Sequence, residues 1–281
     1  MKSSLKNIWK KLFKEEITFS YDSCNNEISK ITDLYPFSGV STEISKTLTP
    51  NIQIRHISII NSNETSKQLI GNLSFYNMLW QINADQDKNL QIRGTHIYKN
   101  ILSKFNYSQI TNREKYIHFE FDIKNKYNNL CFKLFKRLSK ELSSVGILNF
   151  MQKIGNLSIG TEVIKVENGI GLSFSSRFEI LNSIFTVSLH QFNVLSADLY
   201  YKLNEMIDFG LKFSTSKDSE VCYGLGIRVY SNRGEVIGSL NSSRQLCLSF
   251  NDKLGEGIYI NASCRLEKNN FIYGYGFTYE F

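Results

Sequence analysis

The sequence contains little proline and few cysteines. Of its 281 residues only two are proline, so no proline-rich linker divides the chain into separate lobes. The five cysteines are odd in number and form no Cys-x-x-Cys pair, which argues against a disulfide framework and a cysteine-rich zinc site; they are Cys24, Cys131, Cys222, Cys247 and Cys264. No apolar run approaches the roughly 18 residues that a transmembrane helix needs.

Motifs for catalysis and secretion are also missing. The four histidines lie on separate segments without a His-Glu-x-x-His motif, and no P-loop is present. Gly224-Leu225-Gly226 and Gly274-Tyr275-Gly276 lack the third glycine of a dinucleotide site. The first 13 residues lack the continuous apolar stretch that a secretory signal contains. The sequence therefore predicts a protein that is not an enzyme and that carries no cofactor and no metal.

Charge and hydrophobicity narrow the class further. The 33 basic and 26 acidic side chains give a formal net charge of +7. The basic residues are spread through turns and both termini, whereas a nucleic-acid interface gathers them with aromatic residues on one face. No nucleic-acid partner is therefore expected. A hydrophobic content of 42% excludes a wholly disordered chain.

Residues 1–36 are predicted to form an N-terminal helical segment. Within it, Leu5, Ile8, Trp9, Leu12 and Phe13 share one helical face, and lysines occupy another. This basic amphipathic helix could lie on an anionic membrane surface, act as a targeting presequence or dock on the protein itself. A cleaved presequence fits least, because the segment uses lysine in place of arginine and runs into Glu15-Glu16.

A second short helix is predicted from Ser23 to Leu34. Asp22 or Ser23 can cap it, and Pro36 can stop it. The residues expected to share one of its faces are Cys24, Ile28, Ile31 and Tyr35.

From Phe37 onward the apolar residues recur with period two, which is typical of strands. In the final segment Phe271, Tyr273 and Tyr275 alternate with Ile272 and Gly274. In the clearest of these segments, no charged residue occupies the alternate positions that form the apolar face. Short polar connections such as 268–270 read as hairpin turns. Residues 37–281 contain about nineteen such strand–turn units.

Two architectures fit this alternation: a soluble sandwich or small barrel, and a membrane barrel with its apolar face toward lipid. About nineteen strands would make a barrel too wide for side chains to fill. Most segments have the roughly 9–11 residues of a membrane-crossing strand. Aromatic residues near strand ends suit interfacial girdles, namely Tyr200, Tyr201, Tyr230 and Tyr279. An all-β transmembrane barrel for residues 37–281 is therefore the preferred prediction.

Several segments resemble a known family. In the C-terminal third these are residues 196–202, Val221-Cys222-Tyr223-Gly224-Leu225-Gly226 and 238–242; near the N-terminus they are Pro36-Phe37, 39–43 and 50–54. They are similar to the mitochondrial outer-membrane porin superfamily, and most closely to the channel-forming subunits of the TOM protein translocase. The middle of the chain, roughly residues 62–155, resembles that family only in its succession of alternating strands and turns.

The last strand resembles the β-signal that the outer-membrane sorting machinery reads. Gly274, Phe277 and Tyr279 occupy matching positions, and Gly276 lies between them. Ile272 stands where the signal usually has a polar residue, a departure that would weaken recognition or shift its register.

The resemblance implies a nineteen-stranded barrel with a parallel pair of first and last strands and a helix within the pore. It implies residence in the outer membrane of a mitochondrion or a mitochondrion-related organelle (mitosome). The implied partners are small single-helix TOM subunits, receptor subunits, precursor polypeptides, outer-membrane lipid and further copies of the chain. The sister family, the voltage-dependent anion channels, shares the fold and the terminal signal, so a metabolite porin is the alternative.

The polar parity supplies the candidate lumen residues. One interpretation is that lumenal carboxylates guide basic presequences by complementary charge. The other is that these residues are solvated wall side chains paired with neighbours across strands. The candidates are Glu120, Asp122, Glu179, Asp198, Asp208, Lys212, Arg228, Arg265 and Glu267.

Overall fold

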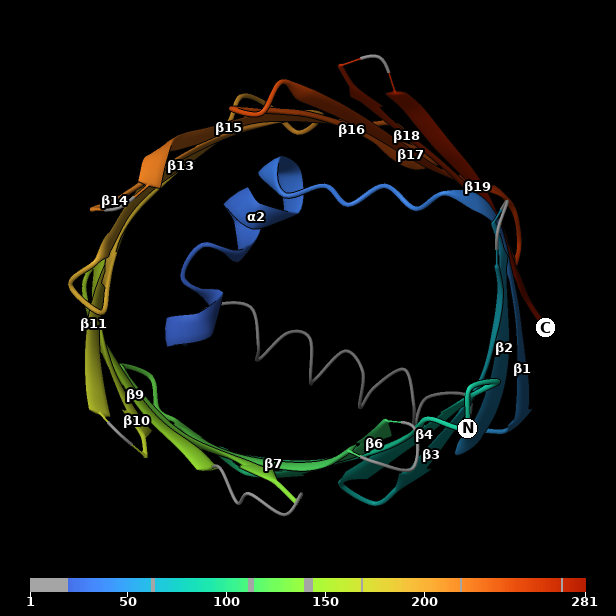
Figure 1. Cartoon of the computed structure of the whole chain (residues 1–281), viewed down its shortest axis with the longest axis horizontal. Helices are drawn as coiled ribbons and strands as arrows, with labels where there is room; N and C mark the ends of the chain where they lie inside the picture. Colours follow the sequence, from blue (N-terminus) through green and yellow to red (C-terminus); the bar gives the residue numbers. More distant parts are fainter. Residues whose placement is uncertain are drawn as a thin grey trace.

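The computed structural model describes residues 20–61, 64–110, 114–138, 144–167, 169–217, 219–268 and 270–281. Their strands form one sheet of nineteen members that closes on itself around a short helix (Figure 1). A single closed sheet excludes the sandwich alternative. The predicted all-β barrel of nineteen strands is confirmed.

Two short helical elements precede the barrel wall, η1 (Tyr21–Ser23) and α2 (Asn26–Thr32). The strands are 8 to 12 residues long, close to the length that a tilted strand needs to cross a bilayer. They are β1 (Gly39–Thr49), β2 (Ile52–Ile60), β3 (Thr65–Phe75), β4 (Met78–Asp85), β5 (Leu90–Tyr98), β6 (Ile101–Ile110), β7 (Glu114–Lys124), β8 (Asn128–Arg137), β9 (Ser144–Ile154), β10 (Leu157–Val166), β11 (Gly169–Ile180), β12 (Ser183–His190), β13 (Val194–Lys202), β14 (Ile207–Ser216), β15 (Ser219–Tyr230), β16 (Gly234–Asn241), β17 (Gln245–Gly255), β18 (Ile258–Glu267) and β19 (Asn270–Glu280).

The strands follow one another as an antiparallel meander, and the exception is the pair that closes the barrel. β1 and β19 run parallel, from Gly39 opposite Gly274 to Ser45 opposite Glu280. Strands that alternate in direction return to the starting direction after an odd number, so the first and the nineteenth must run the same way. The parallel pair implied by the family resemblance is therefore present.

The two faces of the wall differ as the alternation predicts. On β7, Phe119 and Phe121 are exposed on the outer face, whereas Glu120 and Asp122 point inward. The same pattern continues around the barrel and produces a broad apolar outer belt. In a membrane barrel, lipid covers this outer face and the polar face lines the lumen.

Both prolines lie outside the strands. Pro36 precedes β1, and Pro50 lies in the turn between β1 and β2. Because proline has no backbone N–H, it would leave a gap in a hydrogen-bonded ladder that lipid cannot fill. The scarcity of proline is thus a consequence of a closed membrane wall.

The expected aromatic girdle is only half present. Tyr201 and Tyr279 are exposed on the outer face. The assignment of Tyr200 and Tyr230 to the girdle was wrong: they share the inward parity of the lumen residues, and the guanidinium of Arg228 donates a hydrogen bond to the Tyr230 hydroxyl at 3.0 Å. Position near a strand end does not decide the face, because the face follows from parity.

The predicted helix from Ser23 to Leu34 is longer than the observed one. α2 begins after Asn25, so Ser23 belongs to η1 instead of capping the helix. The helix ends at Thr32 because Asp33 leaves helical geometry, with φ −101° and ψ 61°, and Pro36 is not its direct stop. Tyr35 is 89% exposed and does not share the buried face.

The basic amphipathic helix predicted from Leu5 to Phe13 lies outside the described residues. Of the helices that are described, none is long and apolar enough to span a bilayer.

Candidate channel lumen

α2 lies inside the barrel against the inner face of β13–β16 (Figure 1). The side chains of Ile28 and Ile31 are completely buried. A Cβ atom on Gly226 would stand 2.5 Å from Cγ2 of Ile31, and one on Gly210 would stand 3.4 Å from its Cβ. These inward-facing glycines therefore form a seat that a larger residue would obstruct. This close approach gives a physical reason for glycine on the polar parity of β14 and β15.

Arg177 on β11 anchors the start of α2. Its Nη1 donates to Oε2 of Glu27 at 2.8 Å, and its Nη2 donates to Oε1 at 3.0 Å. Nη1 also donates to the carbonyl of Cys24 at 2.8 Å. The Arg177 side chain is only 7% exposed, and its Nε donates to Glu179 at 2.8 Å. Glu179, a predicted lumen residue, thus holds the anchor in place.

Further contacts hold the same segment along the wall. Lys212 pairs with Asp33 at 2.6 Å, just beyond the end of α2. The side-chain amide of Asn25 donates to Asp198 at 3.3 Å. The predicted lumen residues Asp198 and Lys212 therefore contact the helical segment. Near η1, Lys133 on β8 pairs with Asp22.

The segment that follows α2 reaches the parallel seam. Ser263 on β18 donates a hydrogen bond to the carbonyl of Phe37 at 3.2 Å. A Cβ atom on Gly274 would lie 2.5 Å from that carbonyl oxygen and 2.7 Å from the Phe37 ring, and one on Gly276 would lie 3.4 Å from the ring. The glycines of the predicted sorting signal face inward and receive Phe37. Their role in sorting stays a prediction.

Other predicted lumen residues pair across or along the strands. Glu120 accepts from Lys104 on β6 at 3.1 Å. Asp122, almost completely buried, accepts from Asn129 and pairs with Lys124. These contacts agree with the interpretation of paired wall residues. Comparable pairs are Arg55–Glu43, Lys153–Glu179 and Arg228–Glu235.

The three remaining candidates also face inward. Asp208 is nearly buried and stands opposite Arg228 in the register of β14 and β15. Arg265 and Glu267 on β18 stand opposite Cys247 and Gln245 on β17. In the part of the chain that the structure describes, the Nε of Arg265 is buried without a hydrogen-bond partner.

Sequence reasoning missed an apolar area inside the lumen. It consists of Phe135, Val145, Ile147 and Ile164 on β8–β10, and we call it the lumen apolar patch. Phe135 stands opposite Val145, and Ile147 stands opposite Ile164. Phe135 is 39% exposed, and its ring stacks on His118 with centroids 4.0 Å apart. The signal was present in β9, where both parities near Gly146 are apolar.

Comparison with known proteins identifies the family. Residues 19–277 match the family model described as eukaryotic porin. The chain belongs to the eukaryotic porin family. No curated protein matches the sequence. Among solved structures, a triple mutant of the porin from Rh. blastica is similar over 83% of this chain and 91% of that chain, with a TM-score of 0.43 and 8% sequence identity.

Fold and family together make this eukaryotic porin a barrel-type membrane channel. In the described part of the chain, the lumen holds a clamped helix along one side, charges that are largely paired, and the lumen apolar patch. Among the described residues no group of three or more His, Cys, Asp or Glu side chains is placed to hold a metal ion. The arrangement can contact and orient a passing molecule.

Proposed function

We propose that this eukaryotic porin conducts unfolded precursor polypeptides across the outer membrane of a mitochondrion or a mitochondrion-related organelle, as the channel subunit of a TOM-type translocase. The observation that carries the proposal is the lumen apolar patch beside paired charges. An extended polypeptide presents apolar, polar and charged side chains in turn. A pore that passes it needs contacts of each kind that are weak enough to release it.

The wall away from the clamped helix supports the same function. Among the described residues, no hydrogen bond or ion pair joins residues 20–38 to β2–β6. The inner face of these strands is rich in side-chain amides, which can exchange hydrogen bonds with a polypeptide backbone without holding a charge. Examples are Gln53, Gln68, Asn72, Gln81 and Asn83.

The proposed partners follow from the same role. The broad apolar outer belt offers surface to outer-membrane lipid, to small single-helix TOM subunits and to further copies of the chain. Receptor subunits would deliver the precursors to the pore.

A metabolite channel of the voltage-dependent anion type is the second candidate. It is favoured by basic side chains that face the lumen. In the described structure the Nε of Arg265 lacks a hydrogen-bond partner, and Arg93 on β5 faces inward opposite Gln81. Such groups would attract nucleotides and other small anions.

Planar-bilayer recordings of the purified full-length chain distinguish the two functions. For a polypeptide pore we expect little preference for anions, and current block by a basic amphipathic peptide that deepens with applied voltage. We also expect no substantial flux of ATP. A strong anion preference with ATP flux and no peptide block would establish the metabolite channel instead.

The lumen apolar patch is tested in the same recordings. The double variant Phe135→Ser with Ile147→Ser should shorten the dwell time of the peptide by about tenfold, the factor that ~1.4 kcal/mol produces. The matched control, Phe135→Leu with Ile147→Val, keeps the patch apolar and should keep the dwell time. Equal dwell times in all three proteins would remove the patch from the mechanism.

A further inference from the structure

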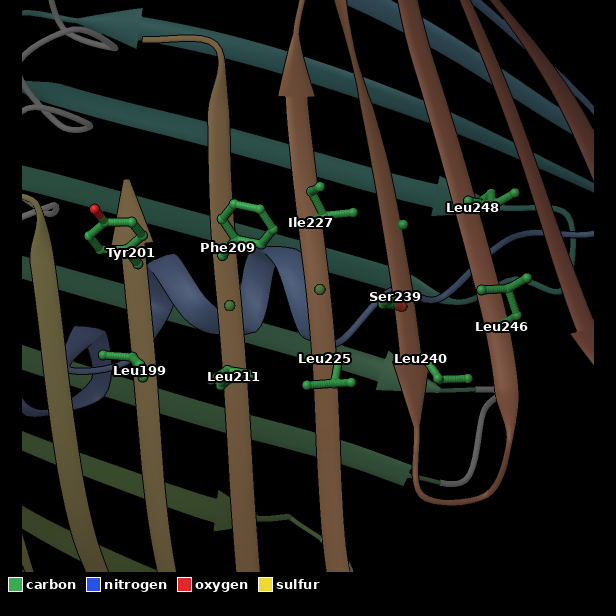
Figure 2. Close-up of a pocket in the computed structure, with 13 residues that line it drawn as sticks. Leu199, Tyr201, Phe209, Leu211, Leu225, Ile227, Ser239, Leu240, Leu246 and Leu248 are labelled. Atoms are coloured by element: carbon green, nitrogen blue, oxygen red, sulfur yellow. The ribbon is translucent and has the colours of Figure 1, made fainter. Parts of the chain in front are cut away.

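The outer surface of the barrel carries an apolar groove of about 670 Å³ that crosses β13–β17. Figure 2 shows its two ridges of outward side chains. Tyr201, Phe209 and Ile227 belong to one ridge, and Leu199, Leu211 and Leu225 belong to the other. The backbone of Gly210, Gly226 and Gly238 also lines the groove. Of these, Gly238 lies between Ile227 and Leu248 on the outer face, so its missing side chain leaves room in the groove.

The shape of the groove suits a single hydrocarbon chain. Its ridges come from residues two apart along each strand, a Cα spacing of about 7 Å. An α-helix, with a diameter of roughly 10–12 Å including side chains, is too wide to enter. Across five neighbouring strands the groove runs for about 19 Å, which is comparable with half of the ~30 Å hydrocarbon core of a bilayer.

The groove is continuous with the lipid-facing belt. Its ridge residues have the same outward parity as the exposed apolar side chains of the neighbouring strands. Among the described residues that line it, none is charged. A hydrocarbon occupant would therefore reach it directly from the bilayer and would meet no polar barrier.

On the inner side of the same wall stands α2. Gly210 and Gly226 line the outer groove and also form the seat of Ile31. Only one layer of backbone separates the two, and Figure 2 shows the helix directly behind these strands. Because both glycines face inward, their missing side chains make room for the helix, whereas the room on the outer face comes from the outward-facing Gly238.

We propose that this groove binds one acyl chain of a membrane lipid against the stretch of wall that seats α2. Gly210 and Gly226 then make room for the helix inside, and Gly238 makes room for the lipid outside. The site rests on the membrane-spanning barrel alone and does not depend on what the lumen conducts.

Photocrosslinking tests the site. The full-length chain is placed in phosphatidylcholine vesicles that contain a phosphatidylcholine with a diazirine on one acyl chain, and labelled residues are mapped by mass spectrometry. We expect labelling of β13–β17 to exceed that of β3–β6 at least fivefold. Gly238→Leu places a side chain in the groove and should reduce this labelling to the average of the belt.

Gly71→Leu is the matched control, because Gly71 on β3 also faces outward and has open space around it. It should leave the labelling of β13–β17 unchanged. Should Gly238→Leu fail to fold, Leu225→Phe narrows the groove from its ridge and should have the same effect. Uniform labelling of the whole belt, or unchanged labelling of the groove variants, would overturn the proposal. So would a copurified apolar helix that crosslinks to the groove in place of lipid.

Discussion

The guanidinium of Arg177 holds both carboxylate oxygens of Glu27, at 2.8 and 3.0 Å, and so fixes α2 to the wall of the barrel. Arg177 is nearly buried and makes further hydrogen bonds to Glu179 and to the Cys24 carbonyl. A partly buried bidentate pair of this kind is specific in geometry. The helix is therefore a fixed part of the lumen surface in this structure.

Removing the carboxylate of Glu27 should loosen α2. Glu27→Gln leaves the Arg177 cation with Glu179 still beside it, and loss of hydrogen bonds to a charged group costs about 1.5–3 kcal/mol. Hydrogen exchange of residues 28–32, measured by mass spectrometry on the full chain, should become at least tenfold faster. Glu256→Gln, in an exposed turn, should change nothing there. An unchanged exchange rate in Glu27→Gln would mean that the glycine seat alone holds the helix.

The pH dependence of Cys24 alkylation shows whether α2 is held against the wall. Its burial raises the pKa of the thiol, although Ser175 and Arg177 partly offset the effect. Because a raised pKa leaves less thiolate at neutral pH, alkylation of Cys24 should be slow at pH 7.5 and should accelerate at higher pH than for an ordinary thiol. Release of α2 by Glu27→Gln should lower the pKa and speed the reaction. The exposed Cys222 should react first in both proteins; equal rates for the two cysteines in the unaltered chain would contradict the burial.

Gly274 should be more sensitive to substitution than Gly276. An added Cβ at Gly274 meets the Phe37 carbonyl at 2.5 Å, whereas at Gly276 the nearest atom is 3.3 Å away. Gly274→Ala should destabilise the seam by about 1–3 kcal/mol, the usual cost of overpacking, and Gly276→Ala by less. Refolding in detergent, followed by heat-dependent gel migration, measures this without any sorting machinery. If both variants refold like the unaltered chain but fail to assemble in the organelle, the glycines act in sorting alone.

Neutralising three lumen carboxylates tests the acidic path. The triple variant of Glu120→Gln, Asp122→Asn and Asp198→Asn should reduce crosslinking of a basic presequence peptide to the pore severalfold. Each carboxylate already has a partner, so each single variant should have a smaller effect. A triple variant at other inward acids, Glu43, Glu114 and Glu235, is the control. Unchanged crosslinking and import in the first triple would count against guidance by these acids.

The wall of the barrel was predictable because parity is a local property of the chain. Alternation at Phe119 and Phe121 assigns a face to each residue without knowledge of its neighbours in space. The same rule places Tyr200 and Tyr230 inside the barrel. They were misplaced because their position near strand ends was taken as a sign of an interfacial girdle. The faces of the predicted lumen residues follow from this rule, and the number of about nineteen strands follows from counting the strand–turn units.

The contacts within the lumen could not be predicted in the same way. Arg177 and Glu27 are 150 residues apart, and no periodicity links a helix position to a strand position. The contact of Ile31 with Gly226 depends on where α2 lies inside the barrel. The contact of Phe37 with Gly274 depends on the pairing of β1 with β19. The lumen apolar patch has a sequence signal, the apolar residues on both faces of β9 near Gly146, but that signal does not show that Phe135 and Ile164 lie beside them on the neighbouring strands.

The parallel seam places the ends of the barrel wall on different sides of the membrane. β1 begins with Gly39 beside Gly274, near the rim where β19 starts, and β19 ends at the opposite rim, where Phe281 bonds to the backbone of Ser45 and Thr47. Because the number of membrane crossings is odd, the chain enters the wall at one face of the bilayer and leaves it at the other. β1, which follows the lumenal segment, begins at the rim that faces one compartment, and Phe281 lies at the rim that faces the other.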